Sequence, residues 1–358
     1  MISKVLQVHI KQAVIDLFCG TGGLTHGLLK SGLNVVAGFD IEGKCKYSYE
    51  ANNQPAKFFA SNVAEVTAEQ LNTLFGNRPI KILAGCAPCQ PFSTYTQAQD
   101  KTLDKKWPLM YEFSRLIREC KPNIITMENV PDVVKHKVYN DFVSELKSLG
   151  YFVSAQKVEC KNYGVPQTRV RHVLLASLYD EIELIEPTHH DPVTVRQAIE
   201  HLPRLKAGEQ DPNDMLHKAS KLSDLNLERI KHSKQGGTWR DWPEQLLAEC
   251  HRKSSGKGYS SVYGRMHWDQ AAPTMTTLCY GFGNGRFGHP EQDRGISLRE
   301  AAILQSFPIS YSFCPEGEEP SMKQVGKLIG NAVPVRLGEV IGISIKQHIT
   351  KYYCESRD

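Results

Sequence analysis

The sequence predicts an α/β fold, in which a parallel β-sheet has helices on both faces and is joined by a second, smaller, irregular domain. Apolar segments of strand length alternate with segments of helix length in the first half of the chain. This alternation is typical of parallel sheets, whose strands are connected through helices. After about residue 180 the pattern becomes irregular and rich in Gly, Pro, His and Trp, and it stays so to about residue 290.

The predicted elements follow in order along the chain. Five apolar segments are predicted to be strands: residues 13–18, 35–39, 80–85, 123–127 and 172–177. Helical periodicity marks residues 24–29, 111–120, 298–304 and 335–345. Because periodicity returns toward the C-terminus, we predict that residues 1–180 plus 320–358 form one domain and residues 181–319 the smaller one.

Composition limits the class of protein but does not define it. A chain of 358 residues with 41% hydrophobic and 23% charged residues is long enough for one large globular domain or two. A net charge of +4 permits an acidic partner without requiring one. Ten scattered cysteines are typical of reduced intracellular thiols. Neither a signal peptide nor an apolar run of about 18 residues is evident, so we expect a cytoplasmic protein outside the membrane.

A glycine-rich turn follows the first predicted strand, in the run Asp16-Leu17-Phe18-Cys19-Gly20-Thr21-Gly22-Gly23. The nicotinamide dehydrogenase fingerprint needs a further glycine where this chain has Thr25. The turn also lacks a basic residue, so a nucleoside that carries an amino acid suits it better than a triphosphate. Asp40, at the end of the second strand, is placed to bind ribose hydroxyls. The alternative is an ordinary tight turn beside a helix-capping aspartate.

The third predicted strand leads into the run Gly85-Cys86-Ala87-Pro88-Cys89-Gln90-Pro91-Phe92-Ser93. Two cysteines at this spacing suggest a zinc or redox site. A zinc site is disfavoured because no second Cys/His pair with ligand spacing lies nearby, and a redox site because a thioredoxin-type pair sits at a different kind of strand–helix junction. A thiol at the carboxyl end of a parallel strand suggests a nucleophile instead. A small buried residue is the remaining alternative.

Two further runs place charged groups beside this thiol. Glu128 ends the fourth strand, so its carboxyl group lies at the same edge of the sheet. In Gln167-Thr168-Arg169-Val170-Arg171 the side chains alternate, so Gln167, Arg169 and Arg171 are expected to point one way. Taken separately, the carboxyl group could cap a helix and the arginines could form a solvated face.

In this order, the motifs resemble those of the cytosine-C5 DNA methyltransferase family of bacterial type. The resemblance runs from Val14 to Val335. It rests on the glycine turn, Pro88-Cys89-Gln90-Pro91-Phe92-Ser93, Glu128-Asn129-Val130, Gln167-Thr168-Arg169-Val170-Arg171, Arg299-Glu300-Ala301-Ala302 with Leu304-Gln305-Ser306-Phe307-Pro308, and Gly330-Asn331-Ala332-Val333-Pro334.

The resemblance implies the Rossmann-like sheet of S-adenosylmethionine-dependent methyltransferases, with S-adenosylmethionine as cofactor and no metal. The implied cofactor-binding residues are Phe18, Gly20, Gly22, Gly23, Leu24, Asp40, Ile41, Asn62, Leu109, Asn331 and Val333. Phe18 and Ile41 would contact the adenine, and Asp40 the ribose. The family often has an aspartate at the place of Asn62, and an amide can accept the same hydrogen bond.

The resemblance also implies a mechanism on double-stranded DNA. Cys89 would add to C6 of a cytosine turned out of the duplex, while Glu128 would neutralise N3. Arg171 would hold the O2 edge and orient Glu128, and Arg169 would anchor phosphate or the loop. Residues 90–106 would form a loop that closes over the substrate.

The irregular region would then select the target sequence. Its basic residues fit phosphate contacts and fall in two clusters: Arg229, Lys231, Lys234 and Arg240, then Arg252, Lys253, Lys257 and Arg265. The tryptophans of the region are expected to be core residues of the smaller domain rather than base contacts. Neither the target sequence nor the cytosine within it follows from the motifs.

Two other functions use the same residues. A tRNA methyltransferase would share the fold and cofactor, but the long recognition region and the lack of a Cys-Phe-Thr run favour DNA. A catalytically inactive DNA-binding regulator is disfavoured by the presence of Cys89, Glu128 and Arg171 together. We expect a monomer in a restriction–modification or related system, with a cognate restriction endonuclease as a separately acting partner.

Overall fold

The structure is a computed structural model that describes residues 11–88 and 108–355. The chain divides into two compact units. Unit 1 comprises Met1–Val158, Val170–Glu186 and Leu337–Asp358, and unit 2 comprises Glu159–Arg169 and Pro187–Arg336. Unit 2 thus takes in more of the chain than residues 181–319, the smaller domain expected from the sequence. A division into compact units does not test whether each part is an independent domain. The predicted domain boundaries therefore stay a prediction.

Unit 1 is built on a seven-stranded sheet in the described residues, with strand order β3-β2-β1-β4-β5-β7-β6. The strands are β1 (Gln12–Leu17), β2 (Val35–Asp40), β3 (Lys57–Ala60), β4 (Ile80–Gly85), β5 (Ile124–Asn129), β6 (Phe152–Glu159) and β7 (Val170–Ser177). Strands β3, β2, β1, β4 and β5 pair in parallel, whereas β7 pairs antiparallel with β5. The predicted α/β class is confirmed, and the antiparallel β7 makes the sheet mostly rather than wholly parallel.

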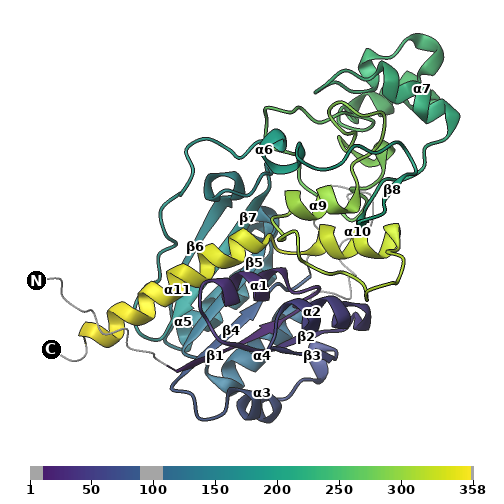
Figure 1. Ribbon diagram of the computed structural model, residues 1–358. Coiled ribbons are helices and arrows are strands. Elements are labelled where there is room, and N and C mark those ends of the chain that lie inside the picture. The colour runs from purple at the N-terminus through teal and green to yellow at the C-terminus, as the bar shows by residue number, and fades with distance from the viewer. Residues whose placement is uncertain (1–10, 89–107, 356–358) are drawn as a thin grey trace, which may run out of the picture. The chain divides into compact units, whose positions relative to one another are not determined.

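Helices cover both faces of this sheet (Figure 1). The helices of unit 1 are α1 (Gly23–Lys30), α2 (Lys46–Asn52), α3 (Ala68–Phe75), α4 (Pro108–Cys120), α5 (Lys137–Ser148) and α11 (Val335–Glu355). One face carries α3, α4 and α5, which bury Phe75, Phe113 and Phe142 against the central strands. Helices α1 and α11 meet on the other face, where a Cβ at Gly338 would lie 2.9 Å from the carbonyl oxygen of Leu24.

The order of the strands brings three carboxyl ends together. In the pairing of β1 with β4, Leu17 lies opposite Gly85, and in that of β4 with β5, Gly85 lies opposite Met127. The central strands β1, β4 and β5 are buried along nearly their whole length, as is usual for strands covered on both faces. The glycine turn after β1, the cysteine loop after β4 and Glu128 on β5 therefore share one edge of the sheet.

Unit 2 consists of short elements joined by long irregular segments. Its helices are α6 (Val195–Ile199), α7 (Asp224–His232), α8 (Glu249–Arg252), α9 (Leu298–Leu304) and α10 (Met322–Asn331), and its strands are β8 (Gln210–Asp211) and β9 (Asp214–Lys218). Trp239, Trp242 and Phe282 pack with Ile230 in an aromatic core. The tryptophans of this unit are therefore core residues, as expected.

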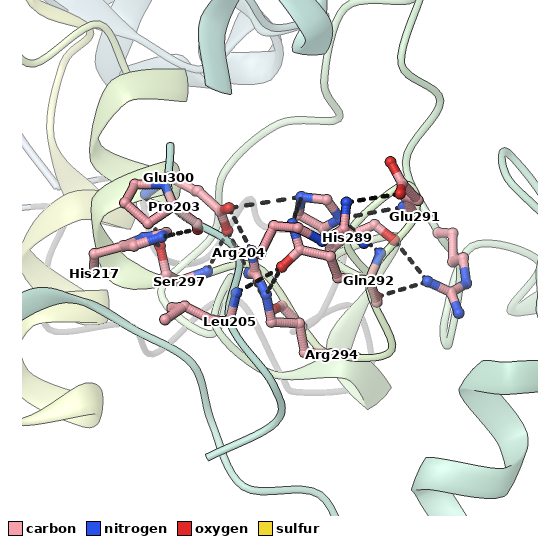
Figure 2. Close-up of polar contacts among 12 residues, drawn as sticks. Pro203, Arg204, Leu205, His217, His289, Glu291, Gln292, Arg294, Ser297 and Glu300 are labelled. Atoms are coloured by element: carbon pink, nitrogen blue, oxygen red, sulfur yellow. Dashed lines mark hydrogen bonds and ion pairs between the residues drawn. The ribbon is translucent and has the colours of Figure 1, made fainter. Parts of the chain in front are cut away.

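A buried polar cluster stabilises the centre of unit 2. Arg294 and Glu300 are fully buried and form two contacts of 2.7 Å between guanidinium and carboxylate. The carboxylate of Glu300 also accepts from the backbone nitrogen of Ser297, the N-cap of α9, and the side chain of Ser297 accepts from the backbone nitrogen of Glu300. This capping box fixes the start of α9. Figure 2 shows Arg294 and His289 both facing this carboxylate.

The cluster makes the stability of unit 2 sensitive to acid. Burial lowers the pKa of His289 to about 4 from its ordinary 6.5; the charge of Glu300 opposes this shift, and the nearby guanidinium groups of Arg294 and Arg265 add to it. In the unfolded chain His289 therefore binds a proton below about pH 6.5, whereas in the folded unit it stays neutral until about pH 4. We expect the free energy of unfolding to fall by up to about 1.4 kcal/mol per pH unit in this window.

Denaturant titrations between about pH 7 and 4 would measure this dependence. His289→Gln removes the titrating group, so its free energy of unfolding should depend less on pH in this range. His201→Gln, at an exposed position, is the matched control and should leave the slope unchanged. An unchanged slope in His289→Gln would contradict the assignment.

One helical stretch, Met322–Tyr352, is long and apolar enough to cross a membrane by length and composition, although the sequence predicted no such segment. Within the structure, 78% of its most apolar window is buried, as in a core helix of a globular protein. Residues 332–334 separate it into α10 and α11.

Candidate active site

The glycine turn after β1 has a backbone that few residues other than glycine adopt. Gly20 and Gly22 have φ angles of 52° and 93°, and Gly22 is the N-cap of α1. Phe18 also lies in the left-handed region, with φ at 59°, which for a bulky residue costs of order 1 kcal/mol or more. Such strain is concentrated at functional sites in folded proteins.

Asp40 fixes this turn from the end of β2. Its two carboxylate oxygens accept hydrogen bonds of 2.8 Å from the backbone nitrogens of Gly20 and Glu42. From the sequence, Asp40 was expected to bind ribose; the structure adds that Asp40 positions the turn itself.

The surroundings of the turn include open space beside Gly20 and an exposed apolar side chain. A Cβ at Gly20 would meet no atom within 4 Å. Ile41 is 73% exposed, which is unusual for a large apolar side chain, and Phe18 is half-buried. Gly23 and Leu24 follow in the buried first turn of α1.

Two further predicted cofactor residues of unit 1 belong to the ends of helical segments. The side chain of Asn62 accepts a hydrogen bond of 3.1 Å from the backbone nitrogen of Ala64, and so caps the short 3-10 helix η2 (Val63–Glu65). Leu109 is half-buried in the first turn of α4. The contact of Asn62 with adenine and the place of Leu109 in the cofactor site stay predictions.

Glu128 and Arg171 form a buried ion pair at the carboxyl end of β5. The Nε atom of Arg171 lies 2.8 Å from Oε1 of Glu128, and both side chains are largely shielded from solvent. The antiparallel register explains the meeting, because Glu128 pairs with Val173 and Asn129 with His172, next to Arg171. The guanidinium also donates from Nη1 to the carbonyl of Val170. The structure thus brings together two of the predicted catalytic residues.

Asn129, which the sequence analysis did not select as a site residue, connects β5 to the cysteine loop. Its side-chain nitrogen donates to the carbonyl of Ala87 at 3.1 Å, and its side-chain oxygen accepts from the backbone nitrogen of Val130. Ala87 lies two positions before Cys89, which is outside the described residues. The signal for Asn129 was its place in the run Glu128-Asn129-Val130.

Cys86 is a poor nucleophile in this setting. Burial raises the pKa of its thiol well above the ordinary value, and the neighbouring carboxylates of Glu128 and Asp16 raise it further. A thiol of raised pKa stays protonated near neutrality, and the thiolate is the attacking form. Cys86 is therefore unsuitable as an attacking group.

Gln167 and Arg169, in the first half of the Gln167–Arg171 run, form their hydrogen bonds within unit 2. Arg169 is buried and donates to the carbonyl of Met275 at 3.0 Å and to that of Ala332 at 3.5 Å. The amide of Gln167 accepts from the backbone nitrogen of Met275 and donates to the carbonyl of Leu304. These contacts tie one loop of unit 2 to the ends of α9 and α10.

The last predicted cofactor residues lie at the end of α10. Asn331 is its final residue and is exposed, and Val333 is buried in the following segment. Gly330 lets α10 approach the loop ahead of it, because a Cβ there would lie 2.2 Å from the carbonyl carbon of Thr276. Asn331 and Val333 both belong to unit 2, and their assignment to the cofactor stays a prediction.

The basic clusters of unit 2 divide into buried and exposed members. Arg265 is buried and donates to the carbonyls of Ile230, Ser233, His289 and Gln292, so the expected phosphate contact is wrong for this residue. Arg229 donates to the carbonyl of Leu246 and lies over the ring of Trp242. The exposed members are Lys231, Lys234, Arg240, Arg252 and Lys253.

Within residues 11–88 and 108–355, no group of three or more His, Cys, Asp or Glu side chains could hold a metal ion.

Comparison with known proteins gives the family. A family model described as C-5 cytosine-specific DNA methylase matches residues 12–347. The chain is 55% identical over 342 residues to Type II methylase M.HgiDII of Herpetosiphon aurantiacus, an alignment that covers 94% of this chain and 96% of the relative. It is 31% identical to Type II methyltransferase M.Eco47II of Escherichia coli, across 94% of this chain and 79% of the relative.

The fold has counterparts among solved structures. A DNA modification methyltransferase encoded within an E. coli prophage matches with a TM-score of 0.74 at 23% identity, covering 95% of this chain and 99% of that one. The S. pombe Dnmt2 methyltransferase matches with a TM-score of 0.59 at 17% identity, covering 94% and 99% of the two chains. At these identities the likeness shows the fold. The sequence matches show more: this chain belongs to the C-5 cytosine-specific DNA methylase family and is a DNA (cytosine-5-)-methyltransferase.

Proposed function

We propose that the enzyme transfers a methyl group from S-adenosylmethionine to C5 of a cytosine turned out of a specific short duplex sequence, through a covalent bond between Cys89 and C6. The observation that carries this proposal is the ion pair of Glu128 and Arg171 at the end of β5, beside the strand that leads to Cys89. A carboxyl group and a guanidinium group at that edge can stabilise the charge that develops on the cytosine ring during the reaction.

The residues of the glycine turn fit a methyl donor that combines a nucleoside with an amino acid. S-adenosylmethionine supplies an electrophilic methyl group on a sulfonium. We propose that Phe18 and the exposed Ile41 hold the adenine, that Asp40 accepts from the ribose, and that Asn62 accepts from the adenine amino group. The remaining proposed cofactor residues are Gly20, Gly22, Gly23, Leu24, Leu109, Asn331 and Val333.

The cytosine ring needs activation because its C5 is a weak nucleophile. Addition of the Cys89 thiolate forms a bond to C6 and moves the electron pair of the C5–C6 double bond toward C5 and N3. Glu128, in its protonated form when the cytosine is bound, supplies a proton at N3, which neutralises the charge that builds there. C5 would then take the methyl group as the bond between the methyl carbon and the donor sulfur breaks, which leaves S-adenosylhomocysteine. A base removes the C5 proton, the electron pair of that C–H bond restores the double bond as the thiolate leaves, and N3 returns its proton to Glu128.

Arg171 and Arg169 have separate proposed roles. Arg171, paired with Glu128, orients the carboxyl group and holds the O2 edge of the cytosine. For Arg169 the sequence allowed either a phosphate contact or a loop anchor. Its buried bonds to the carbonyls of Met275 and Ala332 favour the loop anchor.

We assign residues 181–319 to target recognition and residues 1–180 plus 320–358 to catalysis and cofactor binding. Exposed lysines and arginines of the first group fit phosphate contacts, which would position the duplex without reading its sequence. The target base must leave the stack to expose C6, at a cost of roughly a few kcal/mol. The loop assigned to closing over it, residues 90–106, lies outside the described residues.

The relatives named as type II methylases support a place in a restriction–modification or related bacterial system. In such a system a cognate endonuclease acts separately on the same DNA. We propose a cytoplasmic monomer, since one chain carries all the residues assigned to catalysis and cofactor binding.

The substrate is tested by incubating the enzyme with S-adenosylmethionine labelled in its methyl group, together with either duplex DNA or tRNA. We expect label in DNA, retained in 5-methylcytosine after digestion to nucleosides. Label in tRNA alone would overturn the proposal, and label in neither would contradict an active enzyme.

A further inference from the structure

Tyr259 of unit 2 is the most exposed aromatic side chain that the structure describes, and none of the roles above uses it. Its side chain is 63% exposed, whereas the next most exposed aromatic side chain, that of Phe152, is 51% exposed. A single exposed apolar residue is common on protein surfaces and has no functional meaning by itself. Tyr259 differs because buried residues fix its backbone and because the residues around it in the chain are basic.

The aromatic core of unit 2 holds the backbone of Tyr259 in place. The indole nitrogen of Trp239, a buried residue of that core, donates a hydrogen bond of 2.8 Å to the carbonyl of Tyr259. The ring of His251 stacks on the same indole, with ring centroids 4.2 Å apart. The ring of Tyr263 packs edge-on against that of Trp242. The segment that carries Tyr259 therefore begins and ends in the core.

Between His251 and Tyr259 the chain folds into a compact turn. Ser254–Gly258 form the 3-10 helix η10, and the backbone nitrogen of Tyr259 donates to the carbonyl of Gly256 at 3.2 Å. A Cβ at Gly256 would lie 1.7 Å from the carbonyl oxygen of Cys250, so this close approach requires glycine. The backbone of Tyr259 is thus fixed before any ligand binds, which lowers the entropic cost of a contact through its side chain.

The residues around Tyr259 carry positive charge and hydroxyl groups. From Cys250 to Trp268 the sequence contains no Asp or Glu, and its Lys and Arg residues are Arg252, Lys253, Lys257 and Arg265. Arg252 and Lys253 are exposed, as are the hydroxyl-bearing Ser260 and Ser261 directly after Tyr259. Exposed cations beside an aromatic ring and hydroxyl groups fit duplex DNA, which presents phosphates along its backbone and base edges in its grooves.

We propose that Tyr259 determines part of the target sequence by contacting base edges in the major groove, while Arg252 and Lys253 contact the phosphates beside them. The proposal rests on the proposed function, because it takes duplex DNA as the substrate. Phosphate contacts position a protein on the duplex, and base contacts distinguish one sequence from another. A tyrosine supplies two kinds of base contact, because its hydroxyl donates or accepts a hydrogen bond and its ring packs on the methyl group of thymine.

Selection from a random pool of duplexes measures this sequence preference without turnover. Duplexes with a randomised central segment are mixed with the enzyme and S-adenosylhomocysteine, and the bound duplexes are sequenced. We expect the wild type to enrich one short sequence. Tyr259→Ala should enrich the same sequence with the preference relaxed at the base pairs that the tyrosine contacts, because each base pair of a site contributes separately to affinity.

Affinities for the enriched duplex and for a duplex of unrelated sequence separate base contacts from phosphate contacts. Tyr259→Ala should bind the enriched duplex about 10- to 100-fold more weakly than the wild type, and the unrelated duplex equally well. Arg252→Gln and Lys253→Gln should weaken binding to both duplexes alike, and each should reduce the slope of log affinity against log salt by about one. Met215→Ala, at an exposed apolar position on β9, is the control and should match the wild type on both.

Two tryptophan variants test whether the fixed backbone of Tyr259 matters. Trp239→Phe keeps an aromatic ring in the core and removes the donor to the Tyr259 carbonyl. It should relax the preference at the same base pairs as Tyr259→Ala. Trp242→Phe is the matched control, because it removes an indole hydrogen bond to the hydroxyl of Ser233 in the same core. Its enriched sequence should be that of the wild type.

The outcomes distinguish this proposal from the proposed function. If Tyr259→Ala enriched the wild-type sequence with wild-type affinity, or lost equal affinity for both duplexes, Tyr259 would have no role in sequence preference. Methyl transfer to DNA by the wild type would then leave the proposed function intact. Enrichment of no sequence by the wild type would also overturn the role of Tyr259. A wild type that enriched a sequence but transferred no label to DNA would contradict the proposed function alone.

Discussion

Glu128→Gln is expected to lower the rate of methyl transfer by about 10²- to 10⁴-fold, the usual contribution of a general acid. Glutamine keeps the size and a carbonyl oxygen of the side chain, so the segment around β5 should stay folded. It cannot supply the proton that N3 requires, and it leaves Arg171 without its charge partner. The measurement is single-turnover transfer of labelled methyl groups to duplex DNA, followed as a function of pH.

Controls distinguish this role from a structural one. Glu69→Gln changes an exposed glutamate on α3 and should retain the wild-type rate. Glu128→Gln should still bind S-adenosylhomocysteine as the wild type does, since Glu128 is assigned to the cytosine and not to the cofactor. A rate within a few-fold of wild type would remove Glu128 from the proposed chemistry, and lost cofactor binding would indicate a structural defect.

The second large effect concerns the stability of unit 2. Arg294→Met removes the guanidinium that makes two contacts with Glu300 and leaves a fully buried carboxylate without its main counter-charge. Breaking a buried pair in this way costs about 3 to 5 kcal/mol. Burial by itself raises the pKa of Glu300, but the hydrogen bonds and charge of Arg294 outweigh it and lower the pKa to about 2, so the carboxylate stays charged at neutral pH. We expect the midpoint of denaturant unfolding to fall accordingly.

A double-mutant cycle tests whether the loss comes from the orphaned charge. Arg294→Met combined with Glu300→Leu removes both charges and should recover part of the stability lost in Arg294→Met. Arg204→Met breaks the exposed pair with Glu291 in the same unit and should cost less than about 1 kcal/mol. If Arg294→Met cost no more than Arg204→Met, the cluster in Figure 2 would not stabilise unit 2 as described.

The sequence predicted the central strands well and the edges of the sheet poorly. Strands β1, β2, β4, β5 and β7 were predicted because their continuous apolar runs reflect burial on both faces. The two missed strands, β3 and β6, are at the edges of the sheet. Strand β6 is largely exposed and polar, so its side chains carry little periodic signal. The antiparallel direction of β7 was also missed, because an apolar pattern is the same in either direction.

The sequence motifs located the site. Which side chains contact one another there depends on contacts between residues that are far apart in the chain. The pairing of Glu128 with Arg171 was expected from their runs. The bond from Asn129 to the carbonyl of Ala87 was not, because it joins residues 42 positions apart. Sequence also could not separate buried arginines from exposed ones. Arg265 stood in a basic cluster that suggested DNA, and its backbone contacts emerge only once the irregular unit is folded.

The central claim is that Cys89 carries out methylation of cytosine at C5 in DNA. Bisulfite sequencing tests it most directly, on DNA from cells that express either the wild type or Cys89→Ala. We predict protected cytosines within one short recurring sequence for the wild type, and none above background for Cys89→Ala. The same protected cytosines in both samples would contradict the assignment of Cys89, and no protection with an active, folded wild type would contradict methylation of DNA at C5.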